Sequence, residues 1–226
     1  MNPEEEKQKI TNSLNVAIEV LNECNAEYRI FGSALIVAYT RNIHRRIADI
    51  DILADAKSRA CIVDKLCKRG FLVRSKAIRE VSITQKAEKG NHVLLDILFG
   101  DFTKHYFRRR VLKIGELRFR SDYMKATNYS FNGVNFIGIP LASLIADIKL
   151  TSFKRPRELD RKVLHSEIEK VDLNASKLIE TYGVGEAYIA GIRIPHLVNL
   201  ILFARNTYAR IRFSKALRWL STEKRR

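Results

Sequence analysis

The sequence is poor in three residue types that mark particular architectures. Its 226 residues include only 3 cysteines, 4 prolines and 10 glycines. Few prolines and glycines leave no long flexible linker. The cysteines Cys24, Cys61 and Cys67 cannot all pair with one another, and no C-x-x-C occurs, so a disulfide framework and a Cys/His zinc site are both disfavoured. We expect these cysteines to be small buried hydrophobic residues in a reducing compartment.

Features of a secreted or membrane-spanning protein are also missing. The first residues, Met1–Lys7, show no basic start followed by an apolar stretch, so no secretory signal is expected. The longest strongly apolar run near the end, Leu197–Ala204, is far too short to cross a bilayer. We therefore expect a cytoplasmic protein without a membrane partner. The sequence does not indicate an oligomeric state.

Positive charge is what the sequence has in excess. It contains 41 Lys and Arg against 25 Asp and Glu, which gives a formal net charge of +16. Such a surplus favours polyanionic partners such as RNA, DNA or nucleoside triphosphates. The segment from Arg193 onward has nine basic residues and one acid with interleaved aromatics, a composition that favours RNA binding. Alternatively, these aromatic side chains pack on the core and the charged side chains face solvent. A second basic cluster comprises Lys104, Arg108, Arg109 and Arg110.

The hydrophobic pattern predicts an α+β fold: a mixed-sheet α/β core followed by a helical region. Helical spacing occurs over 8–24, 34–39 and 58–69. Strand patterns occur over 28–31, 49–53, 71–77, 81–85 and 93–99, and the last two are expected to form a hairpin. Beyond Pro140 the pattern is helical, with segments at about 158–170, 174–182, 185–192 and from 195. We expect a core over 1–139 and a helical C-terminal region over 140–226.

Three aspartates are candidates for a metal site. Asp49 and Asp51 are two apart on a strand, so both side chains leave the same face. Asp96 lies inside an apolar strand, where a carboxylate costs several kcal/mol unless it is paired or bound to metal. It either forms a salt bridge with one of the many arginines or joins the first two carboxylates through sheet pairing. Three converging carboxylates suit Mg²⁺.

A Gly-Ser pair stands between the first predicted strand and the helix that follows it. Gly32 allows the backbone to approach a ligand closely, and the helix that begins at Ser33 offers unpaired N–H groups to an anion. The alternative is a simple helix cap.

The order of these features resembles the DNA polymerase β-like nucleotidyltransferase superfamily. The resemblance is carried by FGSALIVAYTRNIHRRIADIDIL and VLLDILFG. A third stretch, IPLASLIADIKLTSFKRPRELDRKVL, looks like the helix of minimal and AbiEii-like nucleotidyltransferases. It has Arg157-Glu158 where the family has Lys-Asp. Together the three stretches cover residues 28–53, 93–99 and 139–164.

The resemblance implies a role for each candidate residue. Asp49 and Asp51 would bind both metal ions, and Asp96 would complete the metal site and help to deprotonate the acceptor hydroxyl. Gly32 and Ser33 would hold the β- and γ-phosphates of a nucleoside triphosphate, which Lys149 would face. Of two neighbouring loop arginines, Arg45 and Arg46, one would touch the triphosphate or merely brace the loop.

The expected activity is Mg²⁺-dependent transfer of a nucleoside monophosphate from an NTP to an acceptor hydroxyl. The +16 charge makes RNA, particularly a tRNA end, the favoured acceptor. A positively charged small molecule such as an aminoglycoside is disfavoured because the protein would repel it. Two alternatives stay open: a non-catalytic nucleic-acid-binding protein, and an AbiEii-like toxin that acts on tRNA or protein.

Overall fold

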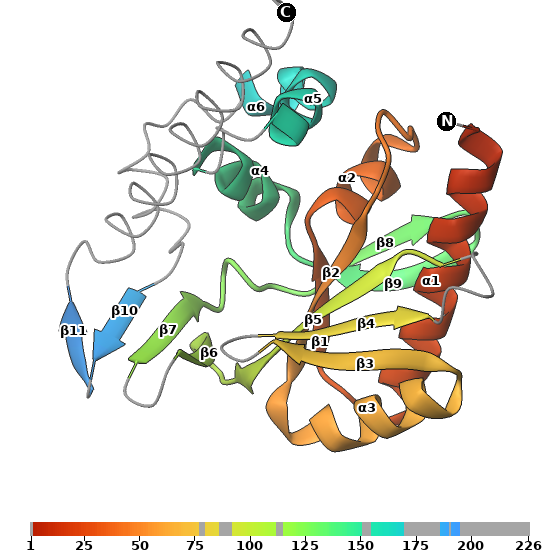
Figure 1. Ribbon diagram of the computed structural model, residues 1–226. Helices are drawn as coiled ribbons and strands as arrows, with labels where there is room; N and C mark the ends of the chain where they lie inside the picture. Colours follow the sequence, from red (N-terminus) through yellow and green to blue (C-terminus); the bar gives the residue numbers. More distant parts are fainter. Residues whose placement is uncertain are drawn as a thin grey trace, which may run out of the picture.

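The computed structural model describes residues 2–76, 80–85, 92–111, 115–150, 155–169, 186–189 and 191–194. In these ranges the strands form one mixed sheet with helices packed on it, so the predicted α+β class is confirmed (Figure 1). The helices are α1 (Pro3–Glu23), α2 (Ser33–Thr40), the 3-10 turn η1 (Ala56–Ser58), α3 (Arg59–Lys68), α4 (Leu141–Leu150), α5 (Arg155–Val163) and α6 (His165–Glu169). The strands are β1 (Tyr28–Phe31), β2 (Asp49–Asp55), β3 (Phe71–Lys76), β4 (Glu80–Gln85), β5 (Leu94–Phe102), β6 (Tyr106–Val111), β7 (Gly115–Arg120), β8 (Thr127–Phe131), β9 (Val134–Gly138), β10 (Glu186–Ile189) and β11 (Ile192–Ile194).

The sheet runs in the order β11-β10-β7-β6-β5-β2-β1-β9-β8. In its middle, β2 pairs antiparallel with β1 and parallel with β5. The first part of β5 also pairs antiparallel with β4, which confirms the predicted hairpin, and its last residues pair with β6. The parallel pairing of β2 with β5 places two distant stretches of sequence side by side at the centre of the molecule.

The buried core lies between the central strands and helices α1 and α2. Alternation along β2 buries Ile50 and Ile52 completely, so Asp49 and Asp51 leave the opposite face. The apolar helix α2 is buried from Ser33 to Ala38 and contacts β1, β2 and β8. Asn2 caps the start of helix α1, and its side chain accepts a hydrogen bond from the N–H of Glu4 at 3.2 Å.

One predicted helix is wrong. The segment 185–192 was expected to be helical, but residues 186–189 and 192–194 form the β10–β11 hairpin around Gly191. Strand β10 pairs antiparallel with β7, and the Arg118 guanidinium lies 3.8 Å from the centroid of the Tyr188 ring. Tyr and Ile favour strands once a neighbouring strand supplies hydrogen bonds, and that neighbour is not visible in local periodicity. The predicted helices at 174–182 and from 195 lie outside the described residues.

The expectation of three reduced, buried cysteines is also wrong. Cys24, at the end of α1, forms a disulfide with Cys61 of α3, and Cys67 is free and exposed. The packing of α1 against α3 brings the two Cα atoms to 5.8 Å across 37 residues of sequence. This proximity is tertiary, so residue spacing did not reveal it. None of the described helices is long and apolar enough to cross a membrane.

Candidate metal and nucleotide site

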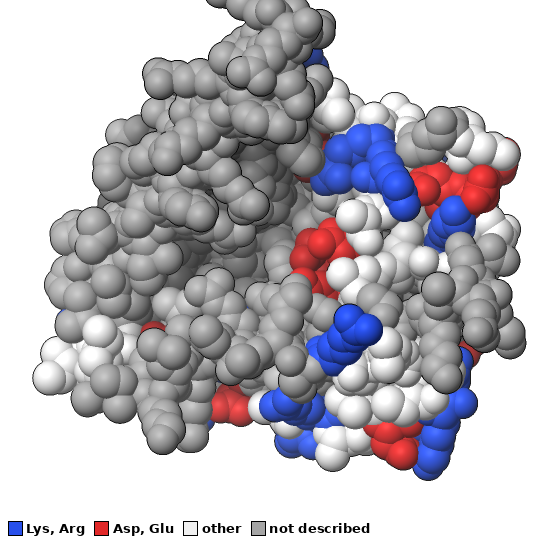
Figure 2. All heavy atoms as spheres, in the orientation of Figure 1, with Lys and Arg blue, Asp and Glu red and all other residues white. Residues whose placement is uncertain are grey.

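The structure brings Asp49, Asp51 and Asp96 together at the middle of the sheet. In the parallel register of β2 with β5, Asp51 stands directly opposite Asp96. One carboxylate oxygen from each of the three residues lies within 4.8 Å of the others. Figure 2 shows Asp and Glu side chains gathered near the centre of the visible face, with Lys and Arg side chains above them. The convergence predicted from sheet pairing is therefore present.

The chemistry of this donor set fits a divalent cation. Two carboxylates about 4 Å apart repel each other by about 4 kcal/mol at an effective dielectric constant near 20, so a third raises the cost of folding further. The three side chains are only partly exposed, and Asp96 Oδ1 is buried, which limits screening by water. A cation offsets this repulsion, and Mg²⁺ prefers a few carboxylates together with substrate phosphates. The described ranges contain no second cluster of this geometry.

Gly32 lies directly against this cluster. Its φ of +73° and ψ of −149° belong to a backbone region used almost only by glycine. A Cβ atom added at this position would overlap Asp51 Oδ2 and come within 3.1 Å of Asp51 Cγ. Because Phe31 of β1 pairs with Asp51 in the sheet, the turn that follows β1 must pass beside that carboxylate. Gly32 therefore allows the turn to lie beside the acidic cluster.

Ser33 is the first residue of α2 and follows this turn. Its side chain is buried, and its Oγ accepts a hydrogen bond from Arg45 Nη2. The first N–H groups of a helix lack intrahelical acceptors, so the start of α2 presents donors next to the acidic cluster. The predicted pair, Gly32 and Ser33, thus lies beside the acidic cluster, and its phosphate-binding role stays a prediction.

The basic loop before β2 is braced from α5. Arg45 donates from Nε to Asp160 Oδ1 at 2.8 Å and from Nη2 to Asp160 Oδ2 at 3.2 Å. His44 Nε2 is 2.7 Å from the same Asp160 Oδ1. Burial alone would raise the pKa of Asp160, but the hydrogen bonds from His44 and Arg45 outweigh it and lower this pKa. The sequence left two roles open for the loop arginines: contact with the triphosphate, or bracing of the loop. The contacts of Arg45 with Asp160 brace the loop.

The other predicted phosphate contacts are placed less fully. The side chain of Arg46 is exposed, and its carbonyl accepts a hydrogen bond from Arg45 Nη1 at 3.0 Å. Lys149 belongs to α4, but its side chain lies outside the described residues. The roles of both residues stay predictions.

Sequence reasoning missed Asp160 and His44. The stretch that carries the resemblance contains Asp160, but no role was assigned to it. One signal was available: Asp160 precedes the buried Leu164 by four residues, so the two share one helix face. An aspartate on the apolar face of a helix needs a partner, and the nearby basic loop was a candidate.

Helix α1 fixes the start of both strands that carry the aspartates. The buried Glu6 accepts, through Oε1, a hydrogen bond from the N–H of Ile47 at 2.8 Å. The buried Ser13 accepts, through Oγ, a hydrogen bond from the N–H of Val93 at 2.8 Å. Ile47 comes just before β2 and Val93 just before β5. Two polar side chains of one helix thus anchor both carboxylate-bearing strands.

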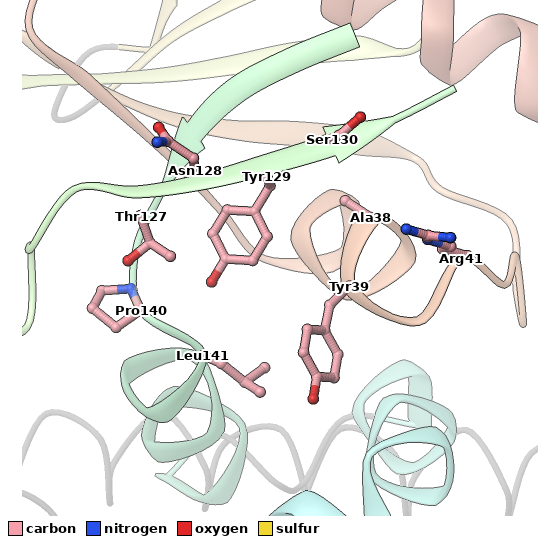
Figure 3. A pocket seen from close by; sticks show the side chains of 9 residues that line it. All are labelled: Ala38, Tyr39, Arg41, Thr127, Asn128, Tyr129, Ser130, Pro140 and Leu141. Atoms are coloured by element: carbon pink, nitrogen blue, oxygen red, sulfur yellow. The ribbon is translucent and has the colours of Figure 1, made fainter. Parts of the chain in front are cut away.

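A separate cavity opens at the other end of α2 (Figure 3). Its volume is about 450 Å³, and Tyr39, Arg41, Tyr129 and Leu141 are among the residues that line it. The Tyr129 hydroxyl donates a hydrogen bond to the carbonyl of Ile139 at 2.9 Å. Eight helical residues span about 12 Å, so α2 separates this cavity from the acidic cluster.

The second basic cluster is partly compensated. Arg108 donates to Asp101 Oδ2 from Nη2 at 2.8 Å and from Nε at 3.1 Å, and its Nε lies 3.9 Å from Glu116 Oε2. Lys104 is exposed, and the side chain of Arg110 lies outside the described residues. Most of the basic segment that starts at Arg193 also lies outside them. The described residues therefore add no support for a surface that binds RNA.

No protein-family model matches the chain, and no curated protein matches it either. The fold is shared with solved nucleotidyltransferase structures. One is the lincosamide antibiotic adenylyltransferase LnuA with lincomycin bound, which is 16% identical with a TM-score of 0.57 over 69% of this chain and 96% of that chain. Another is ANT(2'')-Ia in complex with adenylyl-2''-tobramycin, 16% identical with a TM-score of 0.56 over 76% of this chain and 98% of that chain. These likenesses confirm the predicted nucleotidyltransferase fold, and the AbiEii-like subfamily stays a prediction.

Proposed function

We propose that the protein is a Mg²⁺-dependent nucleotidyltransferase that transfers a nucleoside monophosphate from an NTP to an acceptor hydroxyl. One observation carries the proposal: three aspartate oxygens lie within 4.8 Å of one another, beside a glycine turn that leads into a helix. The same fold is found in LnuA, which is named as an adenylyltransferase.

The residues of the site divide the work of this reaction. Asp49, Asp51 and Asp96 hold the cations, which when bound neutralise the triphosphate and stabilise charge on the attacking and leaving oxygens. Asp96 accepts the proton of the acceptor hydroxyl. The hydroxyl oxygen forms a bond to the α-phosphorus while the bond from that phosphorus to the bridging oxygen breaks, and pyrophosphate leaves. Gly32 and Ser33 bind the β- and γ-phosphates through the start of α2.

For the acceptor we propose the hydroxyl of a small molecule. Two solved structures with this fold contain lincomycin and adenylyl-2''-tobramycin, respectively. RNA is the second candidate, and the net charge of +16 is the observation that favours it.

The test is a transfer assay with each α-³²P-labelled NTP and Mg²⁺. Three acceptor pools are compared: a panel of lincosamides and aminoglycosides, a cellular small-molecule extract, and total cellular RNA. We expect label in a small-molecule product and none after chelation of Mg²⁺. Label in RNA alone would overturn the proposed acceptor and retain the reaction. NTP binding that does not depend on Mg²⁺, without transfer of label to any pool, would contradict the proposed enzymatic activity. It would favour a non-catalytic nucleic-acid-binding protein.

The first prediction concerns Asp51→Asn in this assay. The substitution removes one of three charges and a metal ligand, so we expect the transfer rate to fall by at least about 100-fold. Circular dichroism should report a retained fold. The matched control is Asp64→Asn on α3, which removes a carboxylate from an exposed pair with Lys68 at 2.7 Å and should leave the rate unchanged. A near-normal rate for Asp51→Asn would contradict the metal site.

A further inference from the structure

We propose that Asp160 is a positioning residue that acts through Arg45 to orient the Ser33 hydroxyl toward the phosphates of the nucleotide. The inference rests on the proposed function and deepens it, because it assigns the later helix α5 a part in nucleotide binding. Asp160 is fully buried, although it is a carboxylate on a helix with a highly charged sequence. Such burial requires partners, and their geometry identifies the role.

The three contacts of the Asp160 carboxylate all come from the loop before β2. Asp160 Oδ1 accepts a hydrogen bond from Arg45 Nε at 2.8 Å and lies 2.7 Å from His44 Nε2. Asp160 Oδ2 accepts a hydrogen bond from Arg45 Nη2 at 3.2 Å. Two parallel bonds to one guanidinium fix its plane as well as its position. Helix α5 also contacts α2, so this contact joins the later part of the chain to the Gly32 turn.

Arg45 has little capacity left for a ligand. Its Nε and Nη2 donate to Asp160, Nη2 also donates to Ser33 Oγ, and Nη1 donates to the carbonyl of Arg46 at 3.0 Å. A guanidinium has five N–H groups, so at most one Nη1 hydrogen is left. Arg45 therefore acts on a nucleotide chiefly through Ser33.

The Ser33 hydroxyl is the group whose orientation this arrangement decides. A hydroxyl has one hydrogen to donate and two lone pairs to accept with. Since Arg45 donates to one of these lone pairs, the hydrogen of Ser33 stays available for another acceptor. Ser33 follows Gly32, which touches the Asp51 carboxylate, and it opens α2. An anionic oxygen held by the metal ions at this turn is the acceptor that fits.

The experiment measures equilibrium binding by calorimetry with Mg²⁺ present. The probes are the four ribonucleoside triphosphates, the matching nucleosides and inorganic tripolyphosphate. The variants are Asp160→Asn, Arg45→Lys, Ser33→Ala and the double variant Asp160→Asn/Ser33→Ala, with Asp64→Asn as the matched exposed control. Thermal unfolding of each variant is recorded beside the binding.

We expect Asp160→Asn to raise the dissociation constant of the preferred triphosphate and of tripolyphosphate about tenfold, as loss of one oriented hydrogen bond to a charged group predicts. Binding of the nucleoside should not change. Arg45→Lys keeps the charge but loses the planar guanidinium, so it should also weaken triphosphate binding and leave nucleoside binding unchanged. This variant replaces Asp160→Asn in the test if Asp160→Asn fails to fold. In the double variant the two losses should not add, because Asp160 acts through Ser33.

The inference alone would be overturned by full additivity in the double variant, or by a lower melting temperature with unchanged triphosphate affinity. Equal losses for nucleoside and triphosphate would do the same, since they would indicate a general structural role. A wild-type protein that binds no triphosphate with Mg²⁺ would instead refute the proposed function, and the inference with it.

Discussion

Gly32 places the backbone after β1 directly beside the Asp51 side chain of the neighbouring strand β2. Its conformation and its contact with Asp51 both exclude a Cβ atom. Gly133 offers a comparison, because it also has a positive φ, of +83°, but a Cβ there would meet nothing within 4 Å. Both glycines have a positive φ, but only at Gly32 would a Cβ atom meet a side chain.

We predict that Gly133→Ala lowers the free energy of unfolding by about 1–2 kcal/mol and leaves Mg²⁺-dependent transfer unchanged. Gly32→Ala should lower the free energy of unfolding by more and also reduce transfer at least about 100-fold, because the new methyl group displaces the Asp51 carboxylate. Denaturant unfolding and transfer rates check the two effects. Normal transfer in Gly32→Ala would show that Asp51 can move without loss, contrary to the proposed metal site.

The residues of the acidic cluster were predictable, but the partners of Asp160 were not. Asp49 and Asp51 share a face by the period of a strand, and Asp96 interrupts an apolar run, so local rules identified all three as candidates. The contact of Asp160 with Arg45 depends on how α5 packs on α2, which local periodicity does not encode. Buried ion pairs between distant segments are therefore the part of a site that sequence patterns reveal least.

At the scale of elements, α1 acts as a clamp on the strands of the acidic cluster. Glu6 and Ser13 accept hydrogen bonds from backbone N–H groups just before β2 and β5. Both contacts are buried, so loss of either leaves an unsatisfied backbone donor in the core. The helix thus contributes hydrogen bonds to the site as well as apolar packing.

We predict that Ser13→Ala lowers the free energy of unfolding by about 1–3 kcal/mol, the usual cost of leaving a buried donor unpaired. The measurement is denaturant unfolding. Ser130→Ala, at an exposed position on β8, is the control and should change stability by less than about 0.5 kcal/mol. Equal small effects in both variants would show that the Val93 N–H finds another partner.

The contact of α5 with the basic loop makes part of the stability depend on pH. The groups that face Asp160 are His44 and Arg45, whose hydrogen bonds lower its pKa in the folded protein. A lowered folded-state pKa adds stability above the unfolded-state value, near pH 4, and this stability is lost as pH falls through the folded-state value.

We therefore expect wild type to be more stable than Asp160→Asn at pH 6, with a difference that shrinks as pH falls below about 4. Urea unfolding of both proteins from pH 6 down to pH 3 measures this difference. A difference that stays constant over that range would show that the charge of Asp160 does not contribute.

At the scale of the whole molecule, the sequence predicted the central strands of the sheet but not the β10–β11 hairpin at its edge. The strand pattern of residues 28–99 was strong because each strand alternates or is uniformly apolar. The β10–β11 hairpin was predicted as a helix because its pairing with β7 lies far away in sequence. The division into a core over 1–139 and a helical region over 140–226 stays a prediction, although β10 extends the same sheet.

The Cys24–Cys61 disulfide links α1 to α3 and should stabilise the whole fold. Closing a loop of 37 residues is worth up to about 4 kcal/mol in the chain-entropy account. We predict that Cys24→Ser/Cys61→Ser lowers the free energy of unfolding by about 2–4 kcal/mol under oxidising conditions. Cys67→Ser is the control and should behave as wild type. A wild-type protein equally stable with and without reductant would contradict this prediction.

The parallel pairing of β2 with β5 also decides when the acidic cluster can form during folding. Parallel neighbours cannot be joined by a tight turn, and the connection between β2 and β5 contains α3, β3 and β4. Such long-range contacts tend to form late, after local structure has been built. The nascent chain is thus spared the repulsion between Asp96 and the two aspartates of β2 until β5 pairs with β2.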